Sequence, residues 1–256
     1  MDGPMNTFST EKNSPEHYRR LYDYRVEHIM LDAETYTKST SVSKPPQWRQ
    51  QVQYAIGHTL NDFYSLQPEV RRETPIQFLL ERRWPPMGSA FPSLLSYWDI
   101  KTAIADELMR MASVNHVNDS PILLYEQWHV PVSDLKLELS MIFQLAWSSP
   151  IQGRCLRIQK FLVTANEEVI TGFLHMANVF CNQAYGEPFE TIEIFSLWNG
   201  QKYTYDGSSI SLAESMDYVR LLAVFLEPEK AADNDFKCND LRRAKNVGLE
   251  GRIGLM

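Results

Sequence analysis

The sequence has few cysteines and no long apolar run. Its three cysteines, Cys155, Cys181 and Cys238, show no CxxC spacing, which disfavours both a disulfide framework and a zinc site. The longest apolar stretches, such as Leu221 to Leu226, are far shorter than the ~20 residues that a membrane span needs. Residues 1–13 also carry no apolar signal-peptide region. We therefore expect a cytoplasmic protein with no membrane partner.

Several catalytic motifs are missing as well. There is no GxSxG, HExxH, P-loop or GxGxxG pattern, and the six histidines are scattered without ligand-like pairing. These absences remove the usual basis for a hydrolase, kinase or dinucleotide-binding protein. We expect no cofactor.

The composition is that of a globular protein. Hydrophobic residues make up 44% and charged residues 22% of the 256 residues, and the net charge is -7. One core is expected at this length. We predict a single α+β domain over residues 14–226, a disordered N-terminus over residues 1–13, and a polar, flexible tail over residues 227–256. The acidic balance means that any contact with nucleic acid would need a local basic patch.

Helical periodicity dominates the N-terminal half. Apolar residues recur at three- and four-residue spacing, which predicts helices over residues 14–33, 48–63, 74–84 and 93–111. The first begins with Ser14-Pro15-Glu16, which combines an N-cap, a proline in the first turn and an acidic residue. Residues 37–46 and 113–120 are predicted loops.

The period changes to two after Pro121. Alternating apolar residues predict strands over residues 122–128, 135–147 and 155–163, which would form an antiparallel meander with a turn at Ser133-Asp134. In the long strand, the odd-numbered residues from Leu135 to Trp147 should face the core. This meander is the expected centre of a mostly antiparallel sheet.

Further elements follow the meander. Asn166 should begin a helix that crosses the sheet and ends near Gly186. A strand pair over residues 189–198 and 201–205 should be joined by a turn at Asn199-Gly200. The capping box Ser211–Glu214 predicts the last helix.

The order of these elements over residues 46–226 resembles the RecB-like branch of the PD-(D/E)XK nucleases, which includes Cas4. The helical half contains Gly57-His58-Thr59-Leu60-Asn61, and a carboxylate-bearing strand, the meander, the crossing helix, the strand pair and a helix follow. The resemblance implies a G-x-x-x-H motif on a helix, an Asp ending the second meander strand and a D/E-x-K pair on the third. In that family the carboxylates hold a divalent metal and the lysine helps to position the attacking water.

The sequence departs from this pattern at the residues that matter for catalysis. Gly57 matches the glycine, but Asn61 stands where the family has His, Phe143 falls at or near the expected Asp, and Ile158 takes the acidic position before Lys160. Neither Phe nor Ile offers an oxygen ligand to Mg²⁺. The resemblance therefore implies a nuclease-like fold without catalytic or metal-binding residues. In such a fold Lys160 could be a relic or a phosphate contact, and the simpler alternative is an amphipathic strand lysine at a sheet edge.

Glu126 is the second relic candidate. Its position in the strand puts it on the apolar side, where a carboxylate is costly unless it is paired or bound to metal, whereas a register slip by one residue would expose it. Asp134 and Glu138 are interpreted as a turn residue and a solvent-facing residue. The alternative is an active metal-dependent nuclease with Glu126, Asp134 or Glu138 at the metal.

Local basic residues are the candidates for binding nucleic acid. They flank the third predicted helix or lie on the third meander strand: Arg71, Arg72, Arg82, Arg83, Arg154, Arg157 and Lys160. Together with tryptophans they could hold a single strand, although short basic pairs are commonly solvated helix ends. We predict a catalytically inactive, nucleic-acid-binding or scaffold subunit of a DNA/RNA-processing or defence assembly, with a protein partner. A protein-interaction module without a nucleic-acid role is the other alternative.

Overall fold

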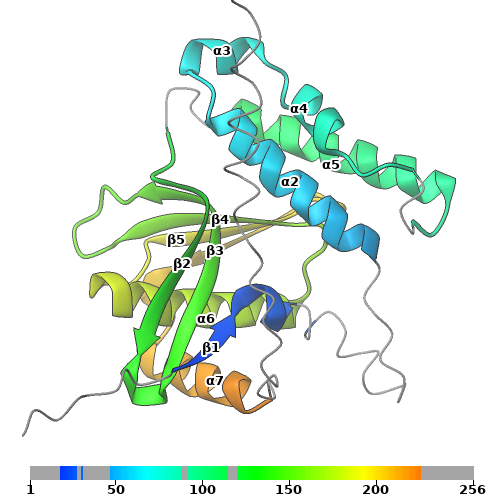
Figure 1. Ribbon diagram of the computed structural model, residues 1–256. Coiled ribbons are helices and arrows are strands. Elements are labelled where there is room, and N and C mark those ends of the chain that lie inside the picture. Colours follow the sequence, from blue (N-terminus) through cyan, green and yellow to red (C-terminus); the bar gives the residue numbers. More distant parts are fainter. Residues whose placement is uncertain (1–17, 28–29, 31–46, 88–90, 115–119, 226–256) are drawn as a thin grey trace, which may run out of the picture. The chain divides into compact units, whose positions relative to one another are not determined.

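The computed structural model describes residues 18–27, 30, 47–87, 91–114 and 120–225. The predictions for residues 1–13 and 227–256, and the helix start at Ser14-Pro15-Glu16, lie outside these ranges. Within them the protein is a mixed α+β fold built on a six-stranded sheet (Figure 1). No helix in this part of the chain combines the length and apolarity that crossing a membrane requires.

The sheet is built around β3 (Leu137–Ser148). One edge of β3 pairs antiparallel with β2 (Leu123–Val132) along nearly its whole length. The other edge is shared: β1 (Arg19–Tyr22) pairs with Leu137–Ser140 in parallel, and β4 (Leu156–Leu162) pairs with Leu145–Ser148 antiparallel. The expected meander is thus confirmed, and β3 is its central strand.

Beyond β4 the sheet continues with two more strands, the first parallel to its neighbour and the second antiparallel. β5 (Thr191–Ser196) pairs with β4 in parallel, and β6 (Gln201–Asp206) pairs with β5 antiparallel. The parallel step requires a crossover, which is the helix α6 (Glu167–Tyr185). The sheet is therefore mixed rather than mostly antiparallel.

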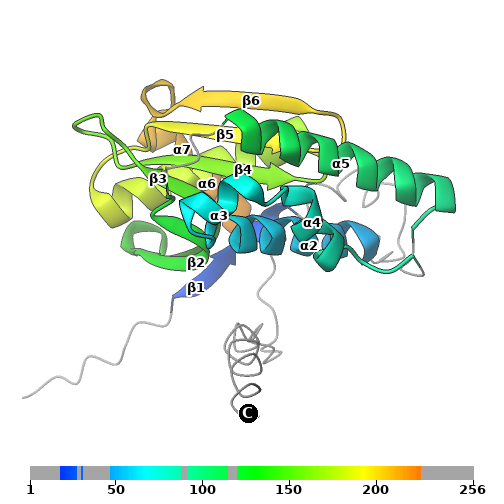
Figure 2. The same ribbon diagram turned by 90° about the horizontal axis from the view of Figure 1, so that it is seen from above.

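Helices cover both faces of the sheet (Figures 1 and 2). On one face lie α2 (Gln47–Tyr64), α4 (Ile76–Arg83) and α5 (Leu94–Val114). The short α3 (Pro68–Glu73), between α2 and α4 in the chain, was not predicted. Their buried side chains form one apolar cluster with Leu145, Trp147, Phe161 and Phe195 of the strands. On the other face lie α6 and α7 (Leu212–Phe225), which pack on each other.

Most predicted helix ends and turns are confirmed. The Asn166 side chain accepts a hydrogen bond from the Val169 N–H at 2.9 Å, and Gly186 ends α6 with φ 73°. The Ser93 hydroxyl caps α5 by accepting from the Ser96 N–H at 3.0 Å. Gly200, in the turn between β5 and β6, has φ 65°, the left-handed conformation that favours glycine.

The predicted helix over residues 14–33 is wrong in its described part. Residues 19–22 form the strand β1, and the helical residues among those described are 23–27 and 30. The local spacing of apolar residues suited a helix, but parallel pairing of Leu21 with Leu139, far away in the sequence, overrides that local preference. Leu21 and Val26 are nevertheless buried, as the apolar stripe predicted.

The long strand begins two residues later than predicted. Ser133–Leu135 form a 3₁₀ turn, and Lys136 then adopts φ 52° before β3 starts at Leu137. The odd-numbered residues from Leu137 to Trp147 are buried, as expected. Ser140, Gln144 and Ala146 are buried too, because helices cover both faces of the sheet.

Candidate functional site where β3 and β4 diverge

β4 separates from β3 beyond the pair Leu145↔Gln159. There the Gln144 side chain bonds to the Phe161 backbone, accepting from its N–H and donating to its carbonyl at 3.0 Å. From α2, the Gln53 side chain accepts from the Val163 N–H at 3.1 Å. These amides replace the missing strand, so the diverging edge of β4 keeps its hydrogen bonds. The result is a fork between two central strands.

The N-terminal segment fills the β3 side of this fork. β1 ends at Tyr22, and the next residue, Asp23, accepts a hydrogen bond from the Ile142 N–H at 3.2 Å. Asp23 is buried although it is a carboxylate. Residues 23–27 form a helical turn, which places Glu27 one turn after Asp23 and therefore on the same face. Both carboxylates thereby point toward β4.

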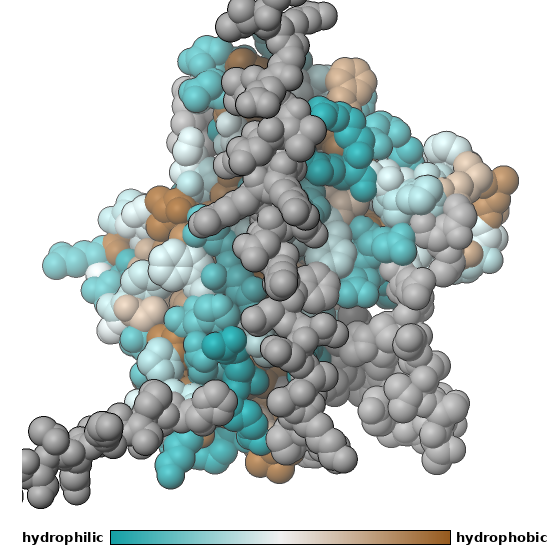
Figure 3. Space-filling model, viewed as in Figure 1, coloured by the Kyte–Doolittle hydropathy of each residue, from teal (hydrophilic) through white to brown (hydrophobic). Residues whose placement is uncertain are grey.

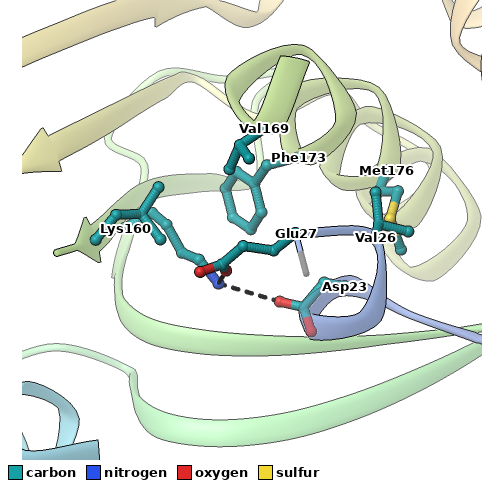
Figure 4. Close-up of a pocket in the computed structure, with 8 residues that line it drawn as sticks. Asp23, Val26, Glu27, Lys160, Val169, Phe173 and Met176 are labelled. Atoms are coloured by element: carbon teal, nitrogen blue, oxygen red, sulfur yellow. Dashed lines mark hydrogen bonds and ion pairs between the residues drawn. The ribbon is translucent and has the colours of Figure 1, made fainter. Parts of the chain in front are cut away.

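Lys160 of β4 meets these carboxylates (Figure 4). Its Nζ lies 3.3 Å from Asp23 Oδ2 and 3.7 Å from Glu27 Oε2, and its side chain is only 7% exposed. The ammonium also lies 4.9 Å from the centroid of the Phe173 ring on α6. A buried charge is tolerated only with such partners. We call Asp23, Glu27 and Lys160 the ionic cluster.

Burial and charge act in opposite directions within the ionic cluster. Burial alone would lower the pKa of the Lys160 ammonium, but Asp23 and Glu27 together outweigh it, so that this pKa lies above its ordinary value. Burial also raises the pKa of the Glu27 carboxyl, and the attraction of Lys160 offsets this only in part. Lys160 is therefore held as a cation between two acids.

The space beside the ionic cluster is small and apolar. A cavity of about 10 Å³ is lined by the three charged residues and by Val26, Leu162, Val169, Phe173 and Met176. This volume has room for about one water molecule. Figure 4 shows Val169 and Phe173 of α6 on one side of the charged groups and Val26 and Met176 beyond them. A nucleic-acid strand cannot reach Lys160 in this conformation.

Two positions that the resemblance pairs with acidic metal ligands, Phe143 and Ile158, lie in the core. Phe143 is 0% and Ile158 1% exposed, and the Phe143 ring packs edge-on against Phe180 of α6 with centroids 5.1 Å apart. Gly57 has a packing role, because a Cβ built on it would lie 2.2 Å from Tyr125 Cε2. Asn61 is partly exposed on α2. Phe143, Ile158 and Gly57 thus contribute to packing.

The carboxylates proposed for an active nuclease do not meet at Lys160. Glu126 is exposed and accepts from the Trp128 indole at 3.0 Å, so the structure has the exposed one of the two orientations that the sequence left open. The reason is the preceding Tyr125, whose φ of 50° interrupts the alternation of the strand. Asp134 is exposed in the 3₁₀ turn, and Glu138 pairs with Arg20 at 2.8 Å.

Sequence reasoning missed the two carboxylates that do reach Lys160. The predicted helix over residues 14–33 includes Asp23 and Glu27 but does not single them out, although their four-residue spacing, next to the buried Val26, is the signal of two acids on one helical face. Nothing in the local sequence indicates that Lys160 is their partner.

The basic residues do not gather into one patch. Arg71 is buried, and its guanidinium donates to the Tyr64 and Leu66 carbonyls at 3.0 Å each, where α2 ends. Arg83 pairs with Asp62 at 2.7 Å. Arg154 and Arg157 lie 4.0 Å and 3.9 Å from acidic partners, and Arg72 and Arg82 are exposed.

Exposed apolar side chains gather elsewhere, at the start of α5. Leu94, Leu95 and Trp98 are 59%, 71% and 47% exposed. Figure 3 shows hydrophobic side chains at this end of α5. Apolar surface of this kind is typical of protein contacts.

Comparisons with known proteins leave the family open. No protein-family model matches the sequence, and no curated protein matches it either. Within the described ranges, no group of three or more His, Cys, Asp or Glu residues could hold a metal ion.

Proposed function

We propose that the chain is a catalytically inactive PD-(D/E)XK-like protein that works as a nucleic-acid-binding or scaffold subunit of a larger assembly. The observation that carries this proposal is the ionic cluster, in which the lysine of the family motif is sealed between Asp23 and Glu27. A lysine engaged in this way is closed off from a nucleic-acid substrate.

The element order supports the fold part of this proposal. The antiparallel β2, β3 and β4, the crossing helix α6, and the pair β5 and β6 follow one another as the resemblance implies. Lys160 lies at the fork between β3 and β4, while Phe143 and Ile158 fill the core. The scaffold role is supported by the exposed apolar residues at the start of α5.

A nuclease assay tests the loss of catalysis. The purified chain, incubated with Mg²⁺ or Mn²⁺ and with single- or double-stranded DNA or RNA, should leave every substrate intact. Anisotropy titrations with the same oligonucleotides test binding. Arg72→Ala and Arg82→Ala should each weaken it and reduce its salt dependence by about one charge, whereas absence of any binding would leave only the scaffold role.

A metal-dependent nuclease is the second candidate, because two carboxylates and a lysine do converge at the fork. Its ligands would be Asp23 and Glu27, with oxygen donors of the kind that Mg²⁺ prefers. Cleavage that is lost in Asp23→Asn and Glu27→Gln, but kept in the control Asp62→Asn, would establish this candidate. Asp62 is a suitable control because it pairs with Arg83 at the surface.

A further inference from the structure

Residues 19–27, which we call the strap, cover Lys160 with few backbone bonds. β1 has four residues, and among the described strands it pairs with β3 alone. After β1, the strap is held by the Asp23 and Glu27 carboxylates at the sheet and by packing of the buried Val26. Within β1, the Arg19 guanidinium also donates to the Ala223 carbonyl of α7. Arg20 adds a surface pair with Glu138.

The sheet does not depend on the strap for its hydrogen bonds. β3 keeps β2 along nearly its full length, and the diverging edge of β4 is already satisfied by Gln144 and Gln53. Removing the strap would expose backbone groups of residues 137–142 on one edge of β3, which water can satisfy. The strap can therefore leave while the sheet stays folded.

The strap also supplies the charges that Lys160 needs. When it leaves, the ammonium loses the two carboxylates at 3.3 Å and 3.7 Å but gains water. The Ile142 N–H, which donates to Asp23 in the closed form, becomes available beside it. An ammonium and a backbone N–H together suit an oxyanion such as a phosphate.

We propose that the strap is a reversible cover that opens as a unit, uncovers Lys160 and the Ile142 N–H, and so exposes a site for a phosphate oxyanion. Asp23 and Glu27 occupy that site in the closed form. The opening does not depend on the proposed function, because it concerns access to Lys160 whether or not the protein cleaves nucleic acid.

Labelling of Lys160 by an amine-acylating reagent, followed by peptide mass spectrometry on the full chain, tests the opening. Lys160 should react at least tenfold faster than global unfolding allows, and with a weaker dependence on urea, because only a small surface is exposed. Reaction only at the global unfolding rate and with its urea dependence would overturn the proposal. This measurement needs no variant.

Variants sharpen the result. Asp23→Asn should speed the labelling of Lys160 several-fold, while Asp62→Asn leaves it unchanged.

Inorganic phosphate should then slow the labelling of Lys160 in Asp23→Asn, and an unchanged labelling rate would refute the oxyanion site. Cleavage of DNA by Asp23→Asn would contradict the inactive nuclease while leaving the strap intact. If Lys160 were labelled no faster in Asp23→Asn than in the unsubstituted chain, the proposed opening of the strap would be refuted, and the proposed loss of catalysis would not be affected.

Discussion

The two faces of the sheet are buried by different means. Beneath α2, α4 and α5 the cluster is apolar and aromatic, and the Phe161 and Phe195 rings stack with centroids 4.9 Å apart. Beneath α6 the same sheet buries Lys160 with Asp23 and Glu27 among apolar residues. Both sets of side chains are closed to solvent. The apolar cluster is the arrangement that stability alone favours, whereas the ionic cluster is not.

The difference lies in the cost of removing charge from water. An apolar side chain gains about 1.5–3 kcal/mol when it is fully buried, whereas a buried ion pair commonly does no better than hydrophobic residues of similar volume. The ionic cluster also has two acids for one base, and burial raises the pKa of the Glu27 carboxyl. The ionic cluster is therefore expected to stabilise the fold less than an apolar core of the same volume.

The largest effect is expected in the apolar face. Leu145→Asp places an unpaired carboxylate in a position that is 0% exposed, and should lower the free energy of unfolding by more than about 4 kcal/mol. Leu145→Ala, the control, should cost about 2–5 kcal/mol through the cavity alone. Urea denaturation measures both, and an aspartate tolerated as well as alanine would show that this face is not closed.

The second-largest loss in the free energy of unfolding is expected from substitutions in the ionic cluster. Lys160→Met leaves two acids without their cation and should cost about 3–5 kcal/mol. The triple variant Asp23→Asn, Glu27→Met, Lys160→Met keeps an oxygen for the Ile142 N–H and removes every charge, so it should unfold within about 1 kcal/mol of the parent. A triple variant as unstable as the single one would mean that the charges themselves stabilise the fold.

A contact between α2 and β2 gives a smaller effect. Gly57→Ala brings a methyl group to 2.2 Å from Tyr125 Cε2, which should cost about 1–3 kcal/mol as overpacking. In a Tyr125→Gly background, which also suits the φ of 50°, the same change should cost much less. Equal costs in both backgrounds, measured by Tm, would place the clash elsewhere.

The smallest effect concerns pH. Burial lowers the pKa of the His58 imidazole, which packs beside Tyr125, with a smaller contribution from the Arg83 charge. Because the unfolded chain then binds a proton more readily, this histidine lowers stability as pH falls below about 6.5, its unfolded value. The melting temperature of His58→Gln should therefore fall less between pH 7 and pH 5. An identical fall in both proteins would contradict the prediction.

Elements whose apolar residues repeat along one face could be predicted from the sequence. The stripe from Trp48 to Phe63 gave α2, and strict alternation gave the long strand, because each pattern continues for several turns or rungs. Caps and turns at Ser93, Asn166 and Gly200 were readable for the same reason, since each uses a local side chain or a local φ.

What the sequence concealed depends on distant partners. β1 exists because β3 offers it an edge, and the ionic cluster exists because residues 23 and 27 meet a lysine on another element. The outward turn of Glu126 rests on the backbone of Tyr125, a residue with no local reason for positive φ. Periodicity describes one segment at a time and carries no information about such pairs.

The parallel pairing of β1 with β3 also imposes an order of events during synthesis. Asp23 and Lys160 are 137 residues apart in the chain, so at about 5–20 residues per second the acid waits on the order of 10 s before its lysine has been translated. During that interval β1 has no strand to join, since residues 137–140 also come later. The first described segment to leave the ribosome can therefore take its place only after more than half of the chain has been translated.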